Sequence, residues 1–277
     1  MLSFGKWWDV TVKGLKISLM VTRAAQRAAR HSAVAVAVAF LAACAGAPGP
    51  DGINDPYETT NRSVHDFNRG LDRALVGPAA KGYGNIVPTP VRRAFGNVAA
   101  TLDLPGDIAN NLLQLRLADA AQNTLRLGVN LTAGLGGLMD ASTAIGLPGK
   151  PTDFGETLHV WGVGEGVYVE LPFAGPSTAR DAAGIVVDVV LNPVTLAVPR
   201  REALAATAIS VFSRLGDRDR FSETVESILY DSADSYAQAR LLYLQNRRFE
   251  LGQEGGASAD GAEDDGFIDP YEDPYAE

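Results

Sequence analysis

Hydrophobic residues recur every three or four positions along most of the chain between residues 55 and 250. This is the spacing of a helix with one apolar face. The clearest stripes are Tyr57, Val64, Phe67, Leu71 and Leu75; Val91, Ala94, Phe95, Val98 and Leu102; Leu125, Val129 and Ala133; and Phe221, Val225, Ile228, Tyr236 and Tyr243. The pattern predicts a single, mainly helical domain over residues 55–250.

Helix-start and helix-stop residues divide this region further. Asp55, Pro56 and Glu58 have the order of a capping box with proline at the first helical position. They predict a first helix that begins at Asp55, and Gly77-Pro78 is expected to end it. Further N-caps are expected at Asp107, at Asp119 and within residues 231–235.

Two later segments depart from the regular helical pattern. Residues 147–180 contain too much Gly and Pro for a helix, and alternation in "VYVELP" fits a short strand, so the mainly α fold includes room for one short β-hairpin there. Residues 182–199 are the most apolar stretch after the N-terminal region, but Asp188 and Asn192-Pro193 make them a poor membrane-spanning helix. Two interpretations stay open for this stretch: the core of the helical bundle, or a surface that lies against lipid.

The first 43 residues have the layout of a secretory signal peptide. Arg23, Arg27 and Arg30 precede about ten uncharged residues, and small residues follow at the end of the apolar run. That run is shorter than the roughly 20 residues that a permanent membrane span needs. Met20 is an alternative translation start, which would give a signal of ordinary length.

Cys44 is the single cysteine among the 277 residues and follows Leu41-Ala42-Ala43. This order resembles a bacterial lipobox, whose cysteine thiol is linked to diacylglycerol before cleavage and then becomes an N-acylated N-terminus. Each buried CH₂ of an acyl chain, such as palmitate, contributes about 0.8 kcal/mol, so a triacylated Cys44 would be a permanent anchor. Ala45 stands where an Asp typically retains lipoproteins in the inner membrane. The expected location is therefore the periplasmic leaflet of the outer membrane.

Charge divides the remaining chain into two parts. Residues 44–250, which begin with a Gly/Pro-rich tether over residues 44–54, carry a net charge of −5. Residues 251–277 hold nine acids and no base. This acidic tail is predicted to be disordered. A chain near −14 after removal of the signal lacks the basic face that a nucleic-acid partner needs.

The sequence motifs typical of enzymes are incomplete. "GLPGKP" (146–151) is not a P-loop, "GVGEG" (162–166) is not a dinucleotide fingerprint, and "GPSTA" (175–179) is not a nucleophile elbow. His65 and His159 share no metal-ligand spacing with carboxylates and are expected to be capping or surface residues. No catalytic residue, metal or cofactor is expected beyond the covalent lipid.

Five stretches in this order resemble the MlaA (VacJ) outer-membrane lipoproteins over roughly residues 55–250: "DPYETTNRSVHDFNRGLD", "VPTPVRRAFGNV", "LGVNLTAGLGGLMD", "DFGETLHVWGVGEGVYVELPFAGPSTARD" and "DSYAQARLLYLQNRR". The resemblance implies a ring-like helical body that lies in the plane of the membrane, is held by a trimeric porin and surrounds an amphipathic channel. Phospholipids that have strayed to the outer leaflet would pass through it to a soluble periplasmic carrier, which maintains lipid asymmetry. A departure is Asp234-Ser235-Tyr236 in place of the family's Asp-Pro-Tyr. In addition, "DPYE" at 55–58 recurs in the tail at 269–272.

Two groups of residues are candidates for control of such a channel. Gly134, Gly136 and Gly137 follow an amphipathic helix and are predicted to hinge a loop that gates the channel. A helix C-cap with tight packing is the alternative for them. The resemblance places Phe67 and Asn68 in a helix that sets the closed channel, and ordinary packing is the alternative for Phe67. Two other functions remain for the whole protein: a scaffold lipoprotein without transport of its own, and an unrecognised lipid hydrolase.

Overall fold

The structure, a computed structural model, describes residues 53–253. The predicted signal peptide, Cys44, nearly all of the tether and nearly all of the acidic tail lie outside these residues. Within them, no helix combines the length and the hydropathy that a membrane crossing requires.

The described chain is mainly helical, as predicted, with one two-stranded antiparallel sheet. Its elements are α2 (Glu58–Leu71), the π-helical turn η2 (Asp72–Val76), α3 (Gly77–Ile86), α4 (Thr89–Leu113), α5 (Leu117–Thr132), α6 (Ala141–Ala144), α7 (Phe154–Val160), β1 (Tyr168–Leu171), β2 (Gly175–Thr178), α8 (Ala179–Val190), α9 (Pro193–Ala197), α10 (Arg200–Arg220), α11 (Ser222–Glu226), the π-helical turn η3 (Ser227–Asp231) and α12 (Ser235–Glu250). The hairpin pairs Tyr168 with Thr178 and Leu171 with Gly175, which confirms the predicted strand.

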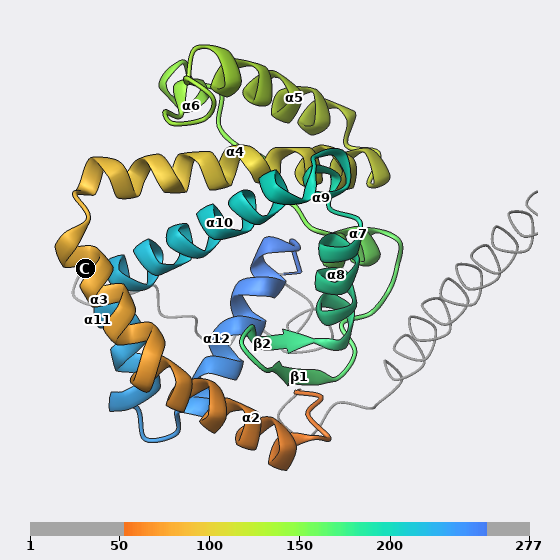
Figure 1. The fold of residues 1–277 in the computed structure, drawn as a ribbon. Helices are drawn as coiled ribbons and strands as arrows, with labels where there is room; N and C mark the ends of the chain where they lie inside the picture. Colours follow the sequence, from red (N-terminus) through yellow and green to blue (C-terminus); the bar gives the residue numbers. More distant parts are fainter. Residues whose placement is uncertain (1–52, 254–277) are drawn as a thin grey trace, which may run out of the picture.

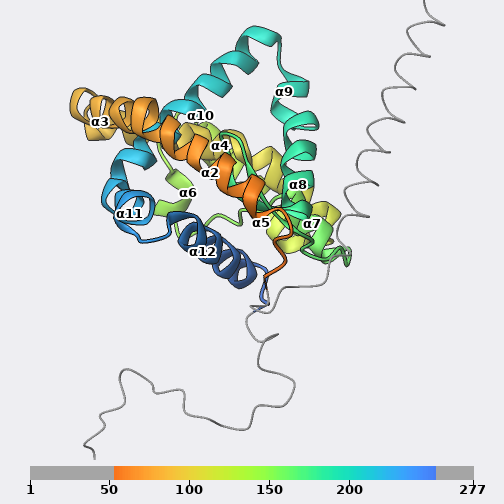
Figure 2. The same cartoon turned by 90° about the horizontal axis from the view of Figure 1, so that it is seen from below.

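The elements follow one another around a closed circuit (Figure 1). The continuous rod of α2, η2 and α3 forms one side, α4 forms the next, and α7, α8 and the hairpin close it. α10 packs along α4 and returns to α3, while α5 covers the other side of α4. In the view turned by 90°, α9 and the adjoining part of α10 project on one side of α2 and α4, and α11 and α12 lie on the other (Figure 2).

The first helix begins two residues later than predicted, with the N-cap at Tyr57 instead of Asp55. α2 starts at Glu58, Tyr57 occupies the N-cap position, and no side chain caps it. The Asp55 carboxylate instead accepts hydrogen bonds from Asn61 (2.8 Å), from Tyr236 and from Arg240 (2.5 Å). The prediction of a capping box was wrong because partners about 180 positions away in the sequence take the carboxylate that a local cap would use.

Gly77-Pro78 does not end the helix, contrary to the prediction. The turn η2 shifts the hydrogen bonding so that the Gly77 N–H reaches Asp72 O, and α3 continues to Ile86. A π-helical turn accommodates the proline ring because Pro78 then stands in the first turn after it, where its missing N–H costs little. The rod is therefore longer than the sequence pattern indicated.

Asp107 and Asp119 do not cap helices either. α4 runs through Pro105 from Thr89 to Leu113, so Asp107 lies inside it. α5 already begins at Leu117, which places Asp119 in its first turn. Side chains that accept a hydrogen bond from the N-terminus of a described helix include Asp140, Asp153, Thr178, Asn192 and Asp234. Asp153 caps α7 within the section predicted to lack helix, whereas Asp234 confirms the cap expected within residues 231–235.

Candidate functional site

The helix α5 carries its polar face inward and its apolar face outward. Asn123, Arg126 and Asn130 are buried at 0%, 7% and 3% exposure, whereas Leu125 and Leu131 are more than half exposed. Both sets keep the helical period, so the sequence pattern predicted the two faces but not which of them meets solvent. An apolar face turned outward is the arrangement expected of a helix that contacts lipid.

The buried polar face of α5 binds the segment that follows it. Asn123 exchanges two hydrogen bonds with the backbone of Lys150 (2.7 and 3.1 Å), and Asn130 accepts bonds from the N–H and hydroxyl of Ser142 (3.0 and 2.9 Å). Arg126 donates to the Leu147 carbonyl and pairs with Asp140. These bonds pair most of the buried polar atoms, the Arg126 Nε being an exception, and hold residues 140–150 against α5.

Exposed large hydrophobic residues gather on two parts of the molecule. The α4–α6 apolar surface comprises Leu112, Leu113, Leu115, Leu117, Leu125, Leu131, Leu135, Leu138, Met139 and Ile145. The α8–α10 apolar surface comprises Ile185, Val186, Val189, Val190, Leu191, Leu196 and Leu204. Exposed apolar sets of this extent mark contacts with other molecules or with membranes.

The second surface divides residues 182–199 into a buried and an exposed part, and contact of the exposed part with lipid stays a prediction. Ala182 and Gly184 at the start of α8 are buried, and a Cβ on Gly184 would lie 2.4 Å from the Gly155 backbone nitrogen. From Ile185 onward most of the large apolar side chains are exposed, although Val187 is half-buried and lines the cavity between α4 and α8. The first turn and a half of α8 is therefore core, and most of the remainder is surface.

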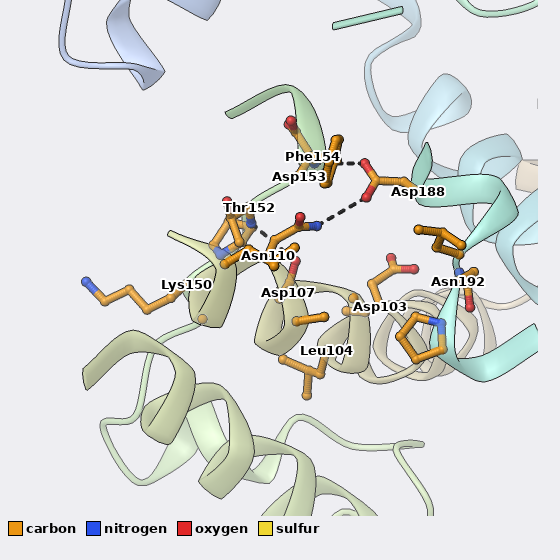
Figure 3. A pocket seen from close by; sticks show the side chains of 18 of the residues that line it. Asp103, Leu104, Asp107, Asn110, Lys150, Thr152, Asp153, Phe154, Asp188 and Asn192 are labelled. Atoms are coloured by element: carbon orange, nitrogen blue, oxygen red, sulfur yellow. Dashed lines mark hydrogen bonds between the residues drawn. The ribbon is translucent and has the colours of Figure 1, made fainter. Parts of the chain in front are cut away.

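A cavity of about 680 Å³ lies between α4, α8 and residues 149–154. Four carboxylates line it: Asp103 and Asp107 from α4, Asp153 from the cap of α7, and Asp188 from α8. Asp103 and Asp188 point toward a shared space, and the Lys150 side chain points away from it (Figure 3). Apolar groups such as Leu104 line the same cavity, so its wall is amphipathic.

Two of the cavity carboxylates, Asp107 and Asp188, are held by backbone and amide groups, whereas Asp153 pairs with Arg247 at 2.7 Å. Asp107 accepts a hydrogen bond from the Thr152 N–H (3.2 Å). Asp188 accepts bonds from the Asn110 amide (3.1 Å) and the Phe154 N–H (3.0 Å) (Figure 3). Burial raises the pKa of Asp188 and of Asp103, and it raises the pKa of Asp107 to about 7, where the neighbouring Asp103, Asp188 and Asp153 add to the shift.

The raised pKa of Asp107 predicts a gain in stability from Asp107→Asn at alkaline pH. Between pH 4 and 7 the folded protein keeps a proton on Asp107 that the unfolded chain has released, so the carboxyl destabilises the fold increasingly as the pH rises toward about 7. Asparagine keeps the acceptor for Thr152 and cannot ionise. We expect a higher Tm than wild type at pH 8 and a clearly smaller gain at pH 5, where only part of the destabilisation has developed.

Thermal unfolding followed by circular dichroism at both pH values measures this effect. Asp217→Asn, at an exposed acid of α10, is the matched control and should not change the difference between the two pH values. An equal stabilisation at pH 5 and pH 8 would show that Asp107 is already ionised well below neutrality.

A second cavity of about 650 Å³ adjoins the first along α4. Ala100 and Asp103 line both of them, and α10 forms the opposite wall of the second. Arg92, Arg93 and Arg220 give this second cavity positive as well as negative groups. Together the two cavities place mixed charges along α4. The same body carries the α4–α6 and α8–α10 apolar surfaces.

The predicted hinge glycines form a tight C-terminal wrap of α5 that rests on α4. The N–H groups of Gly134, Gly136 and Gly137 bond to carbonyls of α5 at 3.0, 3.0 and 2.9 Å. Gly136 and Gly137 have φ of +74° and +90°, which favours glycine. A Cβ on Gly137 would lie 2.9 Å from the Thr101 hydroxyl, and one on Gly134 would lie 2.4 Å from the Met139 carbonyl. The wrap fits the C-cap interpretation, and motion of this loop stays a prediction.

Phe67 and Asn68 join α2 to the turn of the hairpin. The Asn68 amide donates to the Leu171 carbonyl (2.9 Å) and accepts from the Phe173 N–H (2.9 Å). The rings of Phe67 and Phe173 meet edge to face at 5.6 Å, while Phe67 remains half exposed. The pair therefore fixes the rotation of α2 relative to the hairpin, although a role in setting a closed channel stays a prediction.

His65 differs from the expectation of a capping or surface position, whereas His159 does not contradict it. His65 is buried at 3% exposure between Glu170 (3.3 Å) and Ser235 (3.0 Å), so it belongs to the packing of α2 on the hairpin and α12. His159 is half-buried in the last turn of α7, and burial lowers its pKa. Among the described residues, no group of three His, Cys, Asp or Glu side chains has the geometry for a metal ion.

Sequence reasoning missed the buried ionic cluster that ties α8 to α12. The Arg180 side chain is fully buried and pairs with Asp181 (3.0 Å), and Arg247 pairs with both Asp181 (3.2 Å) and Asp153 (2.7 Å). Tyr243 donates to Asp181 at 2.7 Å. A charged residue such as Asp181 in an apolar stretch of the sequence can indicate a buried ion pair. The sequence does not show which residue is its partner, because Arg247 lies 66 positions away.

Comparison with known proteins gives concordant matches. A family model described as "MlaA lipoprotein" matches residues 53–250. The chain is 31% identical over 250 residues to the intermembrane phospholipid transport system lipoprotein MlaA of Escherichia coli K12, which covers 85% of this chain and 96% of the relative. The Haemophilus influenzae lipoprotein of the same description is 32% identical, over 72% of this chain and 79% of the relative.

A solved structure also matches. It concerns the structural basis for maintenance of bacterial outer membrane lipid asymmetry, and its chain superposes with a TM-score of 0.59 at 30% identity. The match covers 71% of this chain and 98% of that one, so nearly the whole of the solved chain has a counterpart here.

Proposed function

Because this chain belongs to the MlaA lipoprotein family, we propose that it forms an amphipathic channel for phospholipids in the outer membrane. It removes phospholipids that have strayed to the outer leaflet and passes them to a soluble periplasmic carrier. The result is maintenance of outer-membrane lipid asymmetry. The protein does this by binding and guiding the lipid, with no covalent step.

The observation that carries this proposal is the pair of cavities with charged and apolar walls along α4, in a body that also exposes two apolar surfaces. Moving a charged headgroup through hydrocarbon is very costly, because the charge loses its water without gaining partners. The first cavity is lined by Arg126 and Arg214 as well as by its carboxylates, so both cavities offer a headgroup partners of either charge along α4. The α4–α6 and α8–α10 apolar surfaces are suited to contact acyl chains at the same time.

The proposed attachment to the membrane combines two elements. The lipid on Cys44 and the tether over residues 44–54 hold the body at the periplasmic leaflet of the outer membrane. The exposed apolar surfaces then let helices lie in the plane of the membrane, since their backbone hydrogen bonds are satisfied internally. This attachment needs no spanning helix, and a trimeric porin is the proposed partner that holds the body in place.

The loop over Gly134, Gly136 and Gly137 is the proposed hinge of the gate. Ala at Gly136 meets no atom within 4 Å but strains a φ of +74°, and Ala at Gly137 also presses on Thr101. We expect the double change of Gly136 and Gly137 to Ala to reduce lipid passage and raise outer-leaflet phospholipid. Palmitoylation of lipid A in cells reports that phospholipid.

The matched control is Gly128→Ala in the exposed face of α5, where a Cβ meets no atom within 4 Å and φ is helical. This change is expected to be neutral or to stabilise α5 by about 0.5–1 kcal/mol. Protein abundance is measured in parallel. Wild-type lipid A in the double variant at normal abundance would exclude the hinge.

A scaffold lipoprotein without transport is the alternative function. It predicts that a deletion strain keeps normal detergent resistance and normal lipid A, whereas loss of a phospholipid channel changes both. Complementation with Leu104→Asp distinguishes the two further, because this side chain lines the first cavity and is itself buried, so it is not part of the exposed apolar surfaces. A scaffold would tolerate the change at normal abundance, and a channel would not.

A further inference from the structure

The first described residues sit in a socket built by the far end of the chain. The Asp55 carboxylate is 3% exposed and accepts hydrogen bonds from the Tyr236 hydroxyl, from Arg240 and from Asn61. We call these three side chains the Asp55 socket. Its ion pair is largely buried, because the Arg240 side chain is 10% exposed. Such a pair contributes strongly only while both partners are present.

The two residues before Asp55 are held mainly by an apolar contact and by a backbone hydrogen bond. Ile53 packs against the core of Tyr168, Tyr236 and Leu244. The backbone carbonyl of Asn54 accepts the Tyr168 N–H at 2.7 Å. The Asn54 side-chain amide adds a hydrogen bond to the Gly166 carbonyl (3.5 Å), a contact that the N-terminal segment owes to this residue type. The socket therefore favours an apolar residue, a residue that offers a backbone carbonyl, and an aspartate.

The acidic tail contains this pattern a second time. Residues 267–272 read "FIDPYE", and residues 53–58 read "INDPYE". Alignment of the shared "DPYE" places Phe267 opposite Ile53 and Asp269 opposite Asp55. The next residues of the tail, "DPYA", repeat Asp-Pro-Tyr once more.

The tail has the length and the charge to reach the socket of its own molecule. α12 has 16 residues, which is roughly 24 Å at about 1.5 Å per residue, and the socket lies in its first turns. The 14 residues from 253 to 266 extend to at most about 50 Å, so they span this distance easily. The tail carries nine acids and no base, while Arg62 and Arg240 lie beside the socket.

We propose that residues 267–272 are a competing copy of residues 53–58 and bind the Asp55 socket within the same molecule. When they do, Asp269 takes the place of Asp55 and the segment 53–57 is released from the body. The free chain between Cys44 and α2 then lengthens, because α2 begins only at Glu58. The exchange is a device that sets how far the body can move from its lipid anchor.

The two segments do not compete equally for the socket, and the experiment has to weaken the stronger one. Asn61 of the socket lies six positions from Asp55, so the N-terminal segment has the higher effective concentration and predominates in wild type. Weakening that segment with Asp55→Asn should shift occupancy to the tail. The full mature chain is therefore compared with and without Asp55→Asn, each combined with Asp269→Ala/Asp273→Ala in the tail.

We expect the tail changes to leave the Tm of wild type unaltered and to lower the Tm of the Asp55→Asn protein by about 2–4 °C, the shift that roughly 1 kcal/mol produces in a domain of this size. Asp264→Ala/Asp265→Ala is the matched control, since it removes the same charge outside the repeated pattern. Additive effects, or an equal effect of the control, would overturn the proposal.

A second measurement does not depend on stability. A photo-crosslinking residue at position 271 should attach to the peptide that contains Tyr236 and Arg240, and the yield should rise in the Asp55→Asn protein. The adduct should have the mass of one chain. A yield that is unchanged by Asp55→Asn, or an adduct between two chains, would contradict binding within one molecule.

Discussion

Asp181→Ala is expected to lower the free energy of unfolding by about 3–5 kcal/mol, the cost of removing one partner from a buried ion pair. The carboxylate is the partner of Arg180, whose side chain is fully buried, and of Arg247. Without it the buried Arg180 guanidinium loses its ion-pair partner, and Arg247 keeps only its pairs with Asp153 and Glu250. Since natural domains are stable by about 5–15 kcal/mol, we expect a large loss of folded protein.

The same carboxylate predicts how stability changes with pH. Burial alone would raise the pKa of Asp181, but its hydrogen bonds and charge attraction to Arg180 and Arg247 outweigh burial and leave the pKa below its ordinary value. Asp181 therefore stabilises the fold above the ordinary carboxyl pKa, and this contribution is lost as the pH falls through the lower folded-state pKa. Wild type should lose stability below about pH 4 more steeply than Asp181→Ala does.

Urea unfolding at pH 7 and pH 3.5 measures both effects. Glu223→Ala, at an exposed acid in α11, makes the same change of charge and should shift stability by no more than about 0.5 kcal/mol. A loss of less than about 1 kcal/mol in Asp181→Ala would show that solvent reaches the two arginines.

Deletion of Phe67 and Asn68 is expected to give a leaky outer membrane. Removing two residues turns the remainder of α2 by about 200° relative to its first half, at 3.6 residues per turn. Asn61 could then still bind the hairpin, but Asp72 would no longer face Arg218, with which it pairs at 2.8 Å. The side of the ring formed by α2, η2 and α3 loses its alignment with α10, and the proposed channel opens.

Detergent sensitivity of cells that carry the deletion beside a wild-type copy is the measurement. A leaky channel makes cells detergent-sensitive even when the wild-type protein is also present. A shortened chain that fails to fold has no such effect, because the wild-type copy supplies the function. Asn68→Ala is the control, because it removes the bonds to the hairpin turn without turning the helix. An intact permeability barrier with normal amounts of the shortened protein would contradict the expectation.

The sequence pattern predicted the type of most elements, because helical periodicity and turn residues are local signals. The apolar break at Asn192-Pro193, the strand at Tyr168–Leu171 and the cap within residues 231–235 are all confirmed. The pattern did not reveal which face of α5 is buried. Leu125 and Asn123 lie on faces of equal period, and the choice between them depends on whether the surroundings are water or lipid.

The errors at helix ends share a different physical cause. Asp55 and Asp107 look like caps because they precede apolar periodic segments, and local rules credit an aspartate to the nearest free N–H groups. In the structure each carboxylate meets a group that is distant in sequence: Arg240 for Asp55, and the Thr152 N–H for Asp107. For the same reason the cavity of α4 and α8 had no signature in the sequence.

The central claim is that phospholipid headgroups enter the polar space beside α4, and site-specific photo-crosslinking in cells tests it most directly. A crosslinking residue at Ala100 or Ala109 lines the cavities, and one at Leu125 faces outward from α5. We predict that all three positions capture phospholipid and that capture at Ala100 and Ala109 falls when Leu104 is changed to Asp, while capture at Leu125 does not. Lipid adducts at Leu125 with none at Ala100 or Ala109 would show that lipid only covers the outside of the protein, and the channel would be excluded.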